Sequence, residues 1–165
     1  MREGEVVRVS DGERVTCIRS GQEGGPFVFE FELAPGAGGP PIHTHDEGNE
    51  TIELLEGALS VRVHGRDRVL RAGDRLTLTP DDPHTFRNAS KTERVRARVT
   101  HGARFERLVV QPGFLATIVY LVDVDPGASR VRNPWLRRLM PLIAGFARLR
   151  GVRPVGTPGE PPIPV

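Results

Sequence analysis

The sequence predicts an all-β fold, an antiparallel barrel or jelly roll, with a helical extension at its C-terminal end. Nineteen glycines and fifteen prolines among 165 residues indicate many turns and short elements rather than a helical bundle. About ten short stretches with alternating apolar residues are separated by turn residues, as expected for strands of a closed or nearly closed barrel. We expect the barrel over residues 1–110, a helical extension packed on the barrel or on a dimer partner over 111–153, and a disordered Pro/Gly-rich tail over 154–165.

The first strands are predicted from alternation and from turn residues. Residues 5–9 and 14–18 are expected to pair around an Asp-Gly turn, which is a strong hairpin signal. Residues 27–33 alternate cleanly and place three phenylalanines on one face, which we expect in the core, with Phe29 and Phe31 also able to line a pocket. The later strands are expected at residues 43–45, 50–55, 59–64, 69–70, 76–78, 84–86 and 93–100.

The chain changes character after Phe105. Residues 114–122 are apolar throughout, so that β-branching favours a strand while their place after the barrel favours a packed helix, and we expect a helix. Asn133 and Pro134 form a helix start, as cap and first-turn residue, and apolar residues then recur at helical spacing up to Gly151. A basic amphipathic helix can lie on a membrane, but we expect this one to cover its own domain or to build a dimer.

Two of the five histidines, His43 and His45, stand two residues apart on a predicted strand. Because the side-chain period of a strand is two, both imidazoles point to the same face, where one ion can bind both. Glu50 opens the next strand and shares a face with Ile52 and Leu54. A carboxylate on an apolar face needs a partner, because a buried unpaired charge is very costly. A metal ion held by the two histidines would be that partner.

A second segment supplies a third histidine. After a Gly-Asp turn, a short strand and a Pro/Asp turn, His84 and Phe86 alternate into another strand, and His84 is the expected fourth ligand. Three imidazoles and one carboxylate suit one divalent ion of Fe, Mn, Ni, Cu or Zn, and suit the oxygen-preferring Ca²⁺ and Mg²⁺ poorly. An octahedral ion would keep about two positions open for water, substrate or O2.

These residues resemble the two motifs of the cupin family, G-x5-H-x-H-x3,4-E-x6-G and G-x5-P-x-G-x2-H-x3-N. The matching positions are His43, His45, Glu50 and Gly57 in the first motif, and Gly73, Pro80, His84 and Asn88 in the second. Three departures are visible: Gly36 and Gly38 straddle the expected first glycine, Pro80 is one place late, and Asp81 stands where the motif has a glycine. The resemblance covers residues 5–110 and implies the double-stranded β-helix of the cupins, their four metal ligands and a homodimer.

For a complete set of three histidines and one glutamate, similarity to the cupins implies an oxygenase of a small organic substrate. Quercetin-dioxygenase-like proteins are among the nearer relatives. Glu50 would lower the net charge at the ion and is the one residue to which we assign catalytic work. The residues expected to line the substrate pocket and keep it dry are Phe29, Phe31, Ile52, Leu54 and Phe86.

Two other functions stay open. The metal could act as a Lewis acid in a redox-neutral isomerisation or decarboxylation. The barrel could instead be a small-molecule-binding module without catalysis, and the four ligands could also be present without a bound ion. Turnover without oxygen, or ligand retention without turnover, would separate these functions from oxygenation.

The two remaining histidines are assigned no ligand role. His64 lies beside a turn, so we expect it on the surface. His101 ends the strand at 93–100 and could reach the mouth of the pocket, but we expect a surface or hydrogen-bonding role for it.

The formal net charge is only +2, but the positive charge is concentrated towards the C-terminus. Residues 126–165 hold seven arginines and one glutamate, and we expect these charges to be solvated or paired with the barrel rather than to bind nucleic acid or a membrane. Cys17 is the only cysteine, and neither a signal peptide nor an apolar run of membrane-spanning length is visible. We therefore expect a cytoplasmic protein.

Overall fold

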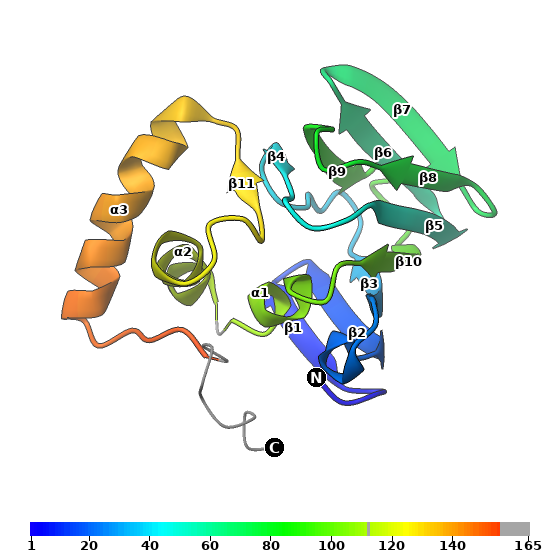
Figure 1. Ribbon diagram of the computed structural model, residues 1–165. Coiled ribbons are helices and arrows are strands. Elements are labelled where there is room, and N and C mark those ends of the chain that lie inside the picture. The colour runs from blue at the N-terminus through cyan, green and yellow to red at the C-terminus, as the bar shows by residue number, and fades with distance from the viewer. Residues whose placement is uncertain (112, 156–165) are drawn as a thin grey trace.

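The computed structural model describes residues 1–111 and 113–155, and it consists of two antiparallel sheets with helices to one side (Figure 1). The first sheet has six strands in the order β1-β2-β3-β10-β5-β8. Their bounds are Val6–Ser10 (β1), Glu13–Arg19 (β2), Phe27–Leu33 (β3), Val95–His101 (β10), Glu50–Glu56 (β5) and Arg75–Leu78 (β8). A short 3₁₀ turn, η1 (Gly21–Glu23), lies between β2 and β3.

The second sheet has five strands in the order β11-β4-β9-β6-β7. Their bounds are Arg130–Val131 (β11), His43–Thr44 (β4), His84–Asn88 (β9), Ala58–Val63 (β6) and Arg66–Arg71 (β7). The predicted all-β fold with a C-terminal helical extension is therefore confirmed.

Alternation along β3 and β10 builds the barrel core. Phe27, Phe29 and Phe31 are at most 5 % exposed, and Val95, Ala97 and Val99 on the neighbouring strand at most 1 %. Phe31 of the first sheet stacks on Phe86 of the second with ring centroids 5.0 Å apart, so the aromatic side chains join the two sheets. The arginines at the alternate positions of β10 face outwards and pair with glutamates on the adjacent strands.

Gly57, between β5 and β6, occupies a position that only glycine fits well. Its φ of 83° lies in the left-handed region, and a Cβ atom there would lie 2.5 Å from the carbonyl oxygen of Arg94. The second glycine of the first motif is thus required by the turn that lets the chain pass from one sheet to the other.

The C-terminal part is built from α1 (Phe105–Val109), α2 (Phe114–Asp123) and α3 (Pro134–Leu149). The helix expected at residues 114–122 is therefore present, and its apolar side chains pack with α3 in a second hydrophobic cluster. Asn133 caps α3 by accepting hydrogen bonds from the backbone N–H groups of Trp135 and Leu136, and the helix continues through Pro141.

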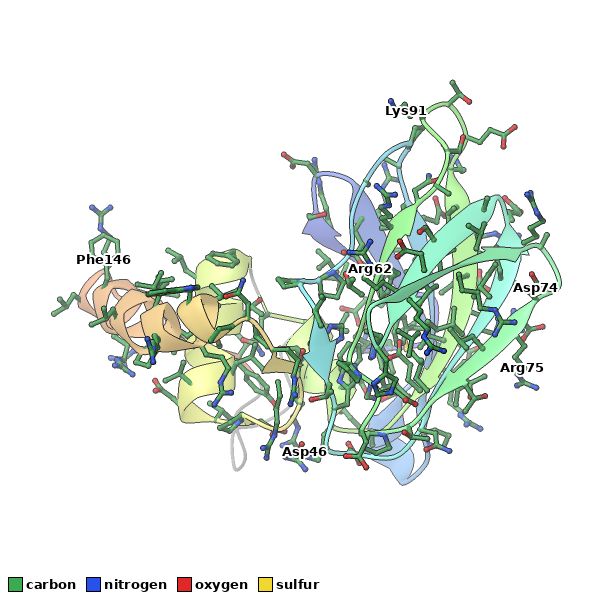
Figure 2. The ribbon with its side chains drawn as sticks, turned by 90° about the horizontal axis from the view of Figure 1, so that it is seen from above. Asp46, Arg62, Asp74, Arg75, Lys91 and Phe146 are labelled. Atoms are coloured by element: carbon green, nitrogen blue, oxygen red, sulfur yellow. The ribbon has the colours of Figure 1, made fainter. Side chains whose placement is uncertain are left out.

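The outer face of α3 is apolar and exposed, as the position of Phe146 far from the barrel illustrates (Figure 2). The exposed side chains of this face are Trp135, Leu139, Leu142, Phe146 and Leu149. No helix in the described part of the chain is long and apolar enough to cross a membrane. Most of the tail predicted at 154–165 lies outside the described residues.

Candidate metal centre

Four predicted ligands meet at one end of the barrel because three strand starts converge there. His43 begins β4, His84 begins β9 and Glu50 begins β5, while His45 directly follows β4. His43 and His84 are paired directly across the two strands. All four side chains are at most 6 % exposed, so the structure brings these groups together in a water-poor site.

Each of the three imidazoles is oriented by a hydrogen bond from its Nδ1 atom to a backbone carbonyl. The acceptors are the carbonyl oxygens of Pro41 for His43 (2.8 Å), Ala128 for His45 (2.7 Å) and Asp82 for His84 (2.9 Å). Because a carbonyl only accepts, Nδ1 must carry the proton, and the lone pair of each neutral ring is then on Nε2. Metal-binding histidines in proteins commonly donate their other ring N–H to a backbone carbonyl in this way, which fixes the tautomer and the orientation of the ring.

Glu50 lies against the Nε2 side of these rings. Its Oε2 atom is 2.9 Å from Nε2 of His84 and 3.4 Å from Nε2 of His45. A protonated His84 would pair with Glu50, but while the rings are neutral these three buried atoms have no aligned hydrogen-bond partner among the described residues, a costly arrangement for the protein alone. The nitrogens of His43, His45 and His84 lie within 4.8 Å of one another, so a cation among them fits the donor set.

The electrostatics of the site follow from burial and from the charges at close range. Burial raises the pKa of Glu50, but His45 and His84 outweigh it and hold that pKa well below its usual range. Burial lowers the pKa of His84, but the contact with Glu50 outweighs burial and raises it. For His43, burial together with the neighbouring His45 and His84 lowers the pKa to about 3.

His101 was not predicted as a member of this cluster, and the surface position favoured for it is wrong. The residue is 2 % exposed and lies edge-on to His45, with ring centroids 4.3 Å apart. Burial lowers its pKa to about 4. The signal was present in the sequence, since His101 continues the inward-facing series of Val95, Ala97 and Val99 on β10. His64 is exposed, as expected.

A cavity of about 310 Å³ leads from the metal centre to the helical extension. Phe29, Phe31 and Phe86 line it, with His43 and Glu50 at its polar end. Ile52 and Leu54, which were expected to line the pocket, are instead fully buried in the barrel core, outside the part of the described chain that lines the cavity. The remaining apolar wall comes largely from the helices, through Phe105 and Leu108 of α1, Phe114, Ile118 and Leu121 of α2, and Leu136 of α3.

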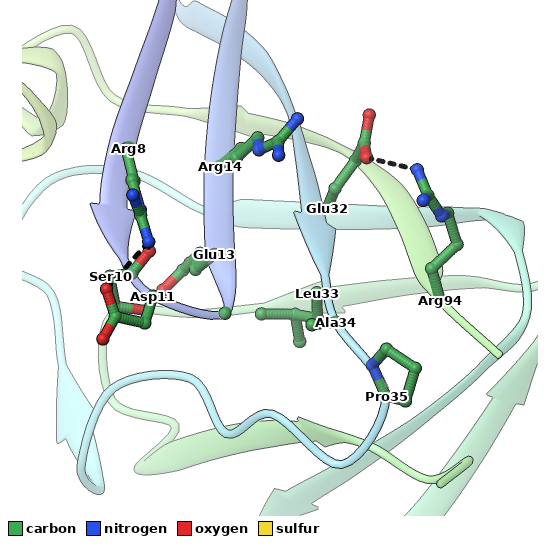
Figure 3. Close-up of a pocket in the computed structure, with 11 residues that line it drawn as sticks. Arg8, Ser10, Asp11, Glu13, Arg14, Glu32, Leu33, Ala34, Pro35 and Arg94 are labelled. Atoms are coloured by element: carbon green, nitrogen blue, oxygen red, sulfur yellow. Dashed lines mark hydrogen bonds and ion pairs between the residues drawn. The ribbon is translucent and has the colours of Figure 1, made fainter. Parts of the chain in front are cut away.

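A second hollow, of about 240 Å³, adjoins this cavity near the turn between β1 and β2 (Figure 3). Charged side chains line it, and Arg8 pairs there with Asp11 and Arg94 with Glu32. Glu13 lines both this hollow and the apolar cavity, and burial raises its pKa to about 7.

Residues 29–101 match the sequence profile of the family described as the cupin domain. Over these residues, which belong to the barrel, the chain is similar to the cupin family. Over 97 residues it is 29% identical to quercetin 2,3-dioxygenase of Bacillus subtilis. This alignment covers 58% of this chain and 29% of that relative. The chain therefore matches less than a third of the length of the curated relative.

Two solved structures show the same fold at low sequence identity. An RmlC-like cupin from Shewanella frigidimarina superposes with a TM-score of 0.53 at 22% identity, covering 62% of this chain and 86% of that chain. The polyketide cyclase RemF from Streptomyces resistomycificus gives a TM-score of 0.52 at 21% identity, covering 62% of this chain and 78% of that chain.

The helical extension helps to orient one histidine of the barrel. The acceptor for His45, Ala128, lies between α2 and β11, and its backbone N–H and that of Gly127 donate to Oδ1 of Asp125. Arg104 donates to the same carboxylate, with Nε 3.0 Å from Oδ2. Sequence reasoning found no signal for this contact, because it joins segments more than eighty residues apart.

The turn before His84 departs from the cupin motif but is held by its own hydrogen bonds. The carboxylate of Asp82 accepts from the backbone N–H and hydroxyl of Thr79, and it is 2.7 Å from Nε2 of His64. The Thr79 backbone hydrogen bond, with His64 as a further contribution, lowers the pKa of Asp82. At the other end of β9, Nδ2 of Asn88 lies 2.8 Å from the carbonyl oxygen of Glu93, a structural use of the last motif residue.

Proposed function

We propose that this protein is a cupin oxygenase of a small, largely apolar organic molecule. In this proposal one divalent transition-metal ion, of Fe, Mn, Ni, Cu or Zn, is held by His43, His45, Glu50 and His84. The observation that carries it is the orientation of three buried imidazoles by backbone carbonyls, which leaves their Nε2 atoms facing a buried carboxylate. The named activity of the Bacillus subtilis relative, dioxygenation of quercetin, supports the same reaction class.

The ion, when bound, would supply open coordination positions for substrate and O2. The side chains of the chain do the remaining work. The backbone-bound histidines offer neutral nitrogen donors, and Glu50, ionised because of its lowered pKa, reduces the net charge of the centre. Glu50 is the proposed catalytic residue, because it lines the cavity and its ionised carboxylate can accept a proton from an enol.

The cavity indicates the class of substrate. A volume of about 310 Å³ admits a molecule of moderate size, and its aromatic and aliphatic lining favours an apolar body. The polar end at His43 and Glu50 favours a substrate that presents an oxygen atom there. Phe29, Phe31 and Phe86 would exclude water from that oxygen, which strengthens its electrostatic interactions.

The test begins with the metal content of the purified protein, measured by elemental mass spectrometry. We expect one transition-metal ion per chain, and its loss in the double variant His43→Ala/His45→Ala. The loaded protein is then tested for O2 consumption with a panel of enols and β-diketones. Equal turnover in the absence of oxygen would overturn the oxygenase assignment in favour of a redox-neutral reaction. Tight ligand retention without turnover under either condition would leave a binding module.

We also propose that the chain forms a homodimer in the cytoplasm. The exposed apolar face of α3 supports the dimer, because its side chains recur at alternating steps of four and three residues, the spacing of a helix-pairing seam. Light scattering coupled to size exclusion would show a dimer for the parent protein and a monomer for Leu142→Glu. A monomeric parent protein would refute the assembly, and fractionation of the source cells would test the location.

A further inference from the structure

His101 is the buried side chain of the metal centre whose hydrogen-bonding capacity is unused. His43, His45 and His84 each donate from Nδ1 to a backbone carbonyl. His101 differs, because neither of its ring nitrogens has a well-aligned hydrogen-bond partner among the described residues, the backbone of Gly102 making only a poorly aligned contact, although the residue is only 2 % exposed. Native proteins rarely leave a buried polar atom unpaired, so a partner beyond the protein's own atoms is expected for this ring.

The position of the ring points to what that partner is. Phe105 stacks on the His101 ring, with centroids 4.2 Å apart and planes inclined by 19°, and so restricts its rotation. A nitrogen of His101 lies within 4.8 Å of donor atoms of His45 and Glu50, while His43 and His84 form a separate group with His45. Donor atoms at opposite positions of an ion with bonds of about 2.1 Å lie about 4.2 Å apart, so a separation within 4.8 Å allows His101, His45 and Glu50 to share one ion.

We propose that His101 is a fifth protein ligand of the ion at the metal centre. The inference rests on the proposed metal centre and adds a fourth imidazole to it. An octahedral ion with five protein ligands keeps one open position rather than two. The substrate or O2 would then bind through a single atom, a tighter restriction than the four-residue motif implies.

The test counts imidazoles on the metal. The protein is loaded with Cu(II) alone, and pulsed electron paramagnetic resonance counts the coordinated imidazoles in the parent protein and in His101→Phe. We expect four imidazoles in the parent protein and three in His101→Phe, with an affinity for Cu(II) that falls by more than the roughly 10–100-fold typical of losing a residue that only orients a ligand. X-ray absorption of the Zn(II)-loaded proteins gives an independent count.

Two further variants make the result decisive. His64→Asn removes the exposed histidine as a control and should keep four imidazoles. The phenylalanine in His101→Phe can keep the stack on Phe105, so the metal-free variant should melt no lower than the parent protein. If His101→Phe does not fold, His101→Gln takes its place and should also show three imidazoles. Three imidazoles in every protein, with unchanged affinity, would overturn the role of His101 and leave the metal centre standing. A parent protein that binds no metal would refute the centre itself.

Discussion

Two neighbouring hollows of the barrel are similar in size but differ in character. The cavity of about 310 Å³ closes on buried histidines and Glu50, several of whose polar atoms have no partner in the described chain. The hollow of about 240 Å³ is lined by exposed charges such as Arg8 and Arg94, which are paired with Asp11 and Glu32 (Figure 3).

The difference shows that the volume of a hollow does not by itself identify the candidate functional site. Exposed ion pairs contribute little to the free energy of folding and are screened by solvent. The charges that line the charged hollow are paired with one another, so they do not require a ligand. Unpartnered polar atoms away from water are costly, and they persist where a ligand or ion completes them. Burial combined with missing partners therefore distinguishes the metal centre from the charged hollow.

The largest contrast between the two hollows should come from removing one side chain at each. His84→Ala removes a donor, and we expect its affinity for Zn(II) to fall by more than the roughly 10–100-fold typical of losing a residue that only orients a ligand. Arg94→Ala, at the charged hollow, should leave the affinity unchanged. Competition titration with a chelating dye measures the Zn(II) affinity of both variants. Equal losses of affinity would contradict the assignment of metal binding to the histidine cluster.

The metal affinity of the histidine cluster should also depend on pH. Glu50 raises the pKa of His84, so in the metal-free protein the proton stays on this ring to a higher pH than on an ordinary histidine. Because the metal must displace that proton, the affinity should rise with pH and level off above the His84 pKa, changing by about tenfold per unit below it. Dye competition from pH 5.5 to 8 tests this, and a flat profile would count against it.

A smaller effect should come from the loop that orients His45. In Asp125→Ala the backbone N–H groups of Gly127 and Ala128 lose their shared acceptor, which loosens the carbonyl that holds His45. We expect metal affinity to fall about tenfold, the lower end for such a partner. Asp123→Ala is the matched control, since Asp123 pairs with Arg148 on the surface of the extension. Equal affinities in the two variants would show that the loop does not tune the site.

A further effect, on stability rather than on metal affinity, should concern Glu13, which lies between the two hollows. Burial raises its pKa to about 7 in the folded protein, above its value in the unfolded chain. The free energy of unfolding is therefore highest, as far as Glu13 is concerned, below the unfolded pKa, where the carboxyl is protonated in both states. This stability is lost as the pH rises through about 7 and the buried carboxyl ionises. Since the side chain is only partly buried, we expect Glu13→Gln to gain about 1–2 kcal/mol over the parent protein between pH 4.5 and 7.5. Urea unfolding at both pH values would show a constant difference if the carboxyl is not responsible.

Local patterns by themselves determined the barrel and the neighbourhood of four candidate ligands. A strand places every second side chain on one face, so the spacing of His43 and His45, and the positions of Glu50 and His84 at strand starts, carry information without any long-range contact. The same rule, extended by two residues beyond Val99, would also have placed His101 inside the barrel.

Tertiary structure decided what surrounds those residues. Residues 114–122 are β-branched and apolar, yet they form a helix because packing against α3 buries their apolar side chains. The same packing brings Phe114 and Ile118 into the cavity wall, in place of the expected Ile52 and Leu54. Contacts between segments far apart in the chain, such as Ala128 with His45, depend on how whole elements dock, and no spacing in the sequence encodes that docking.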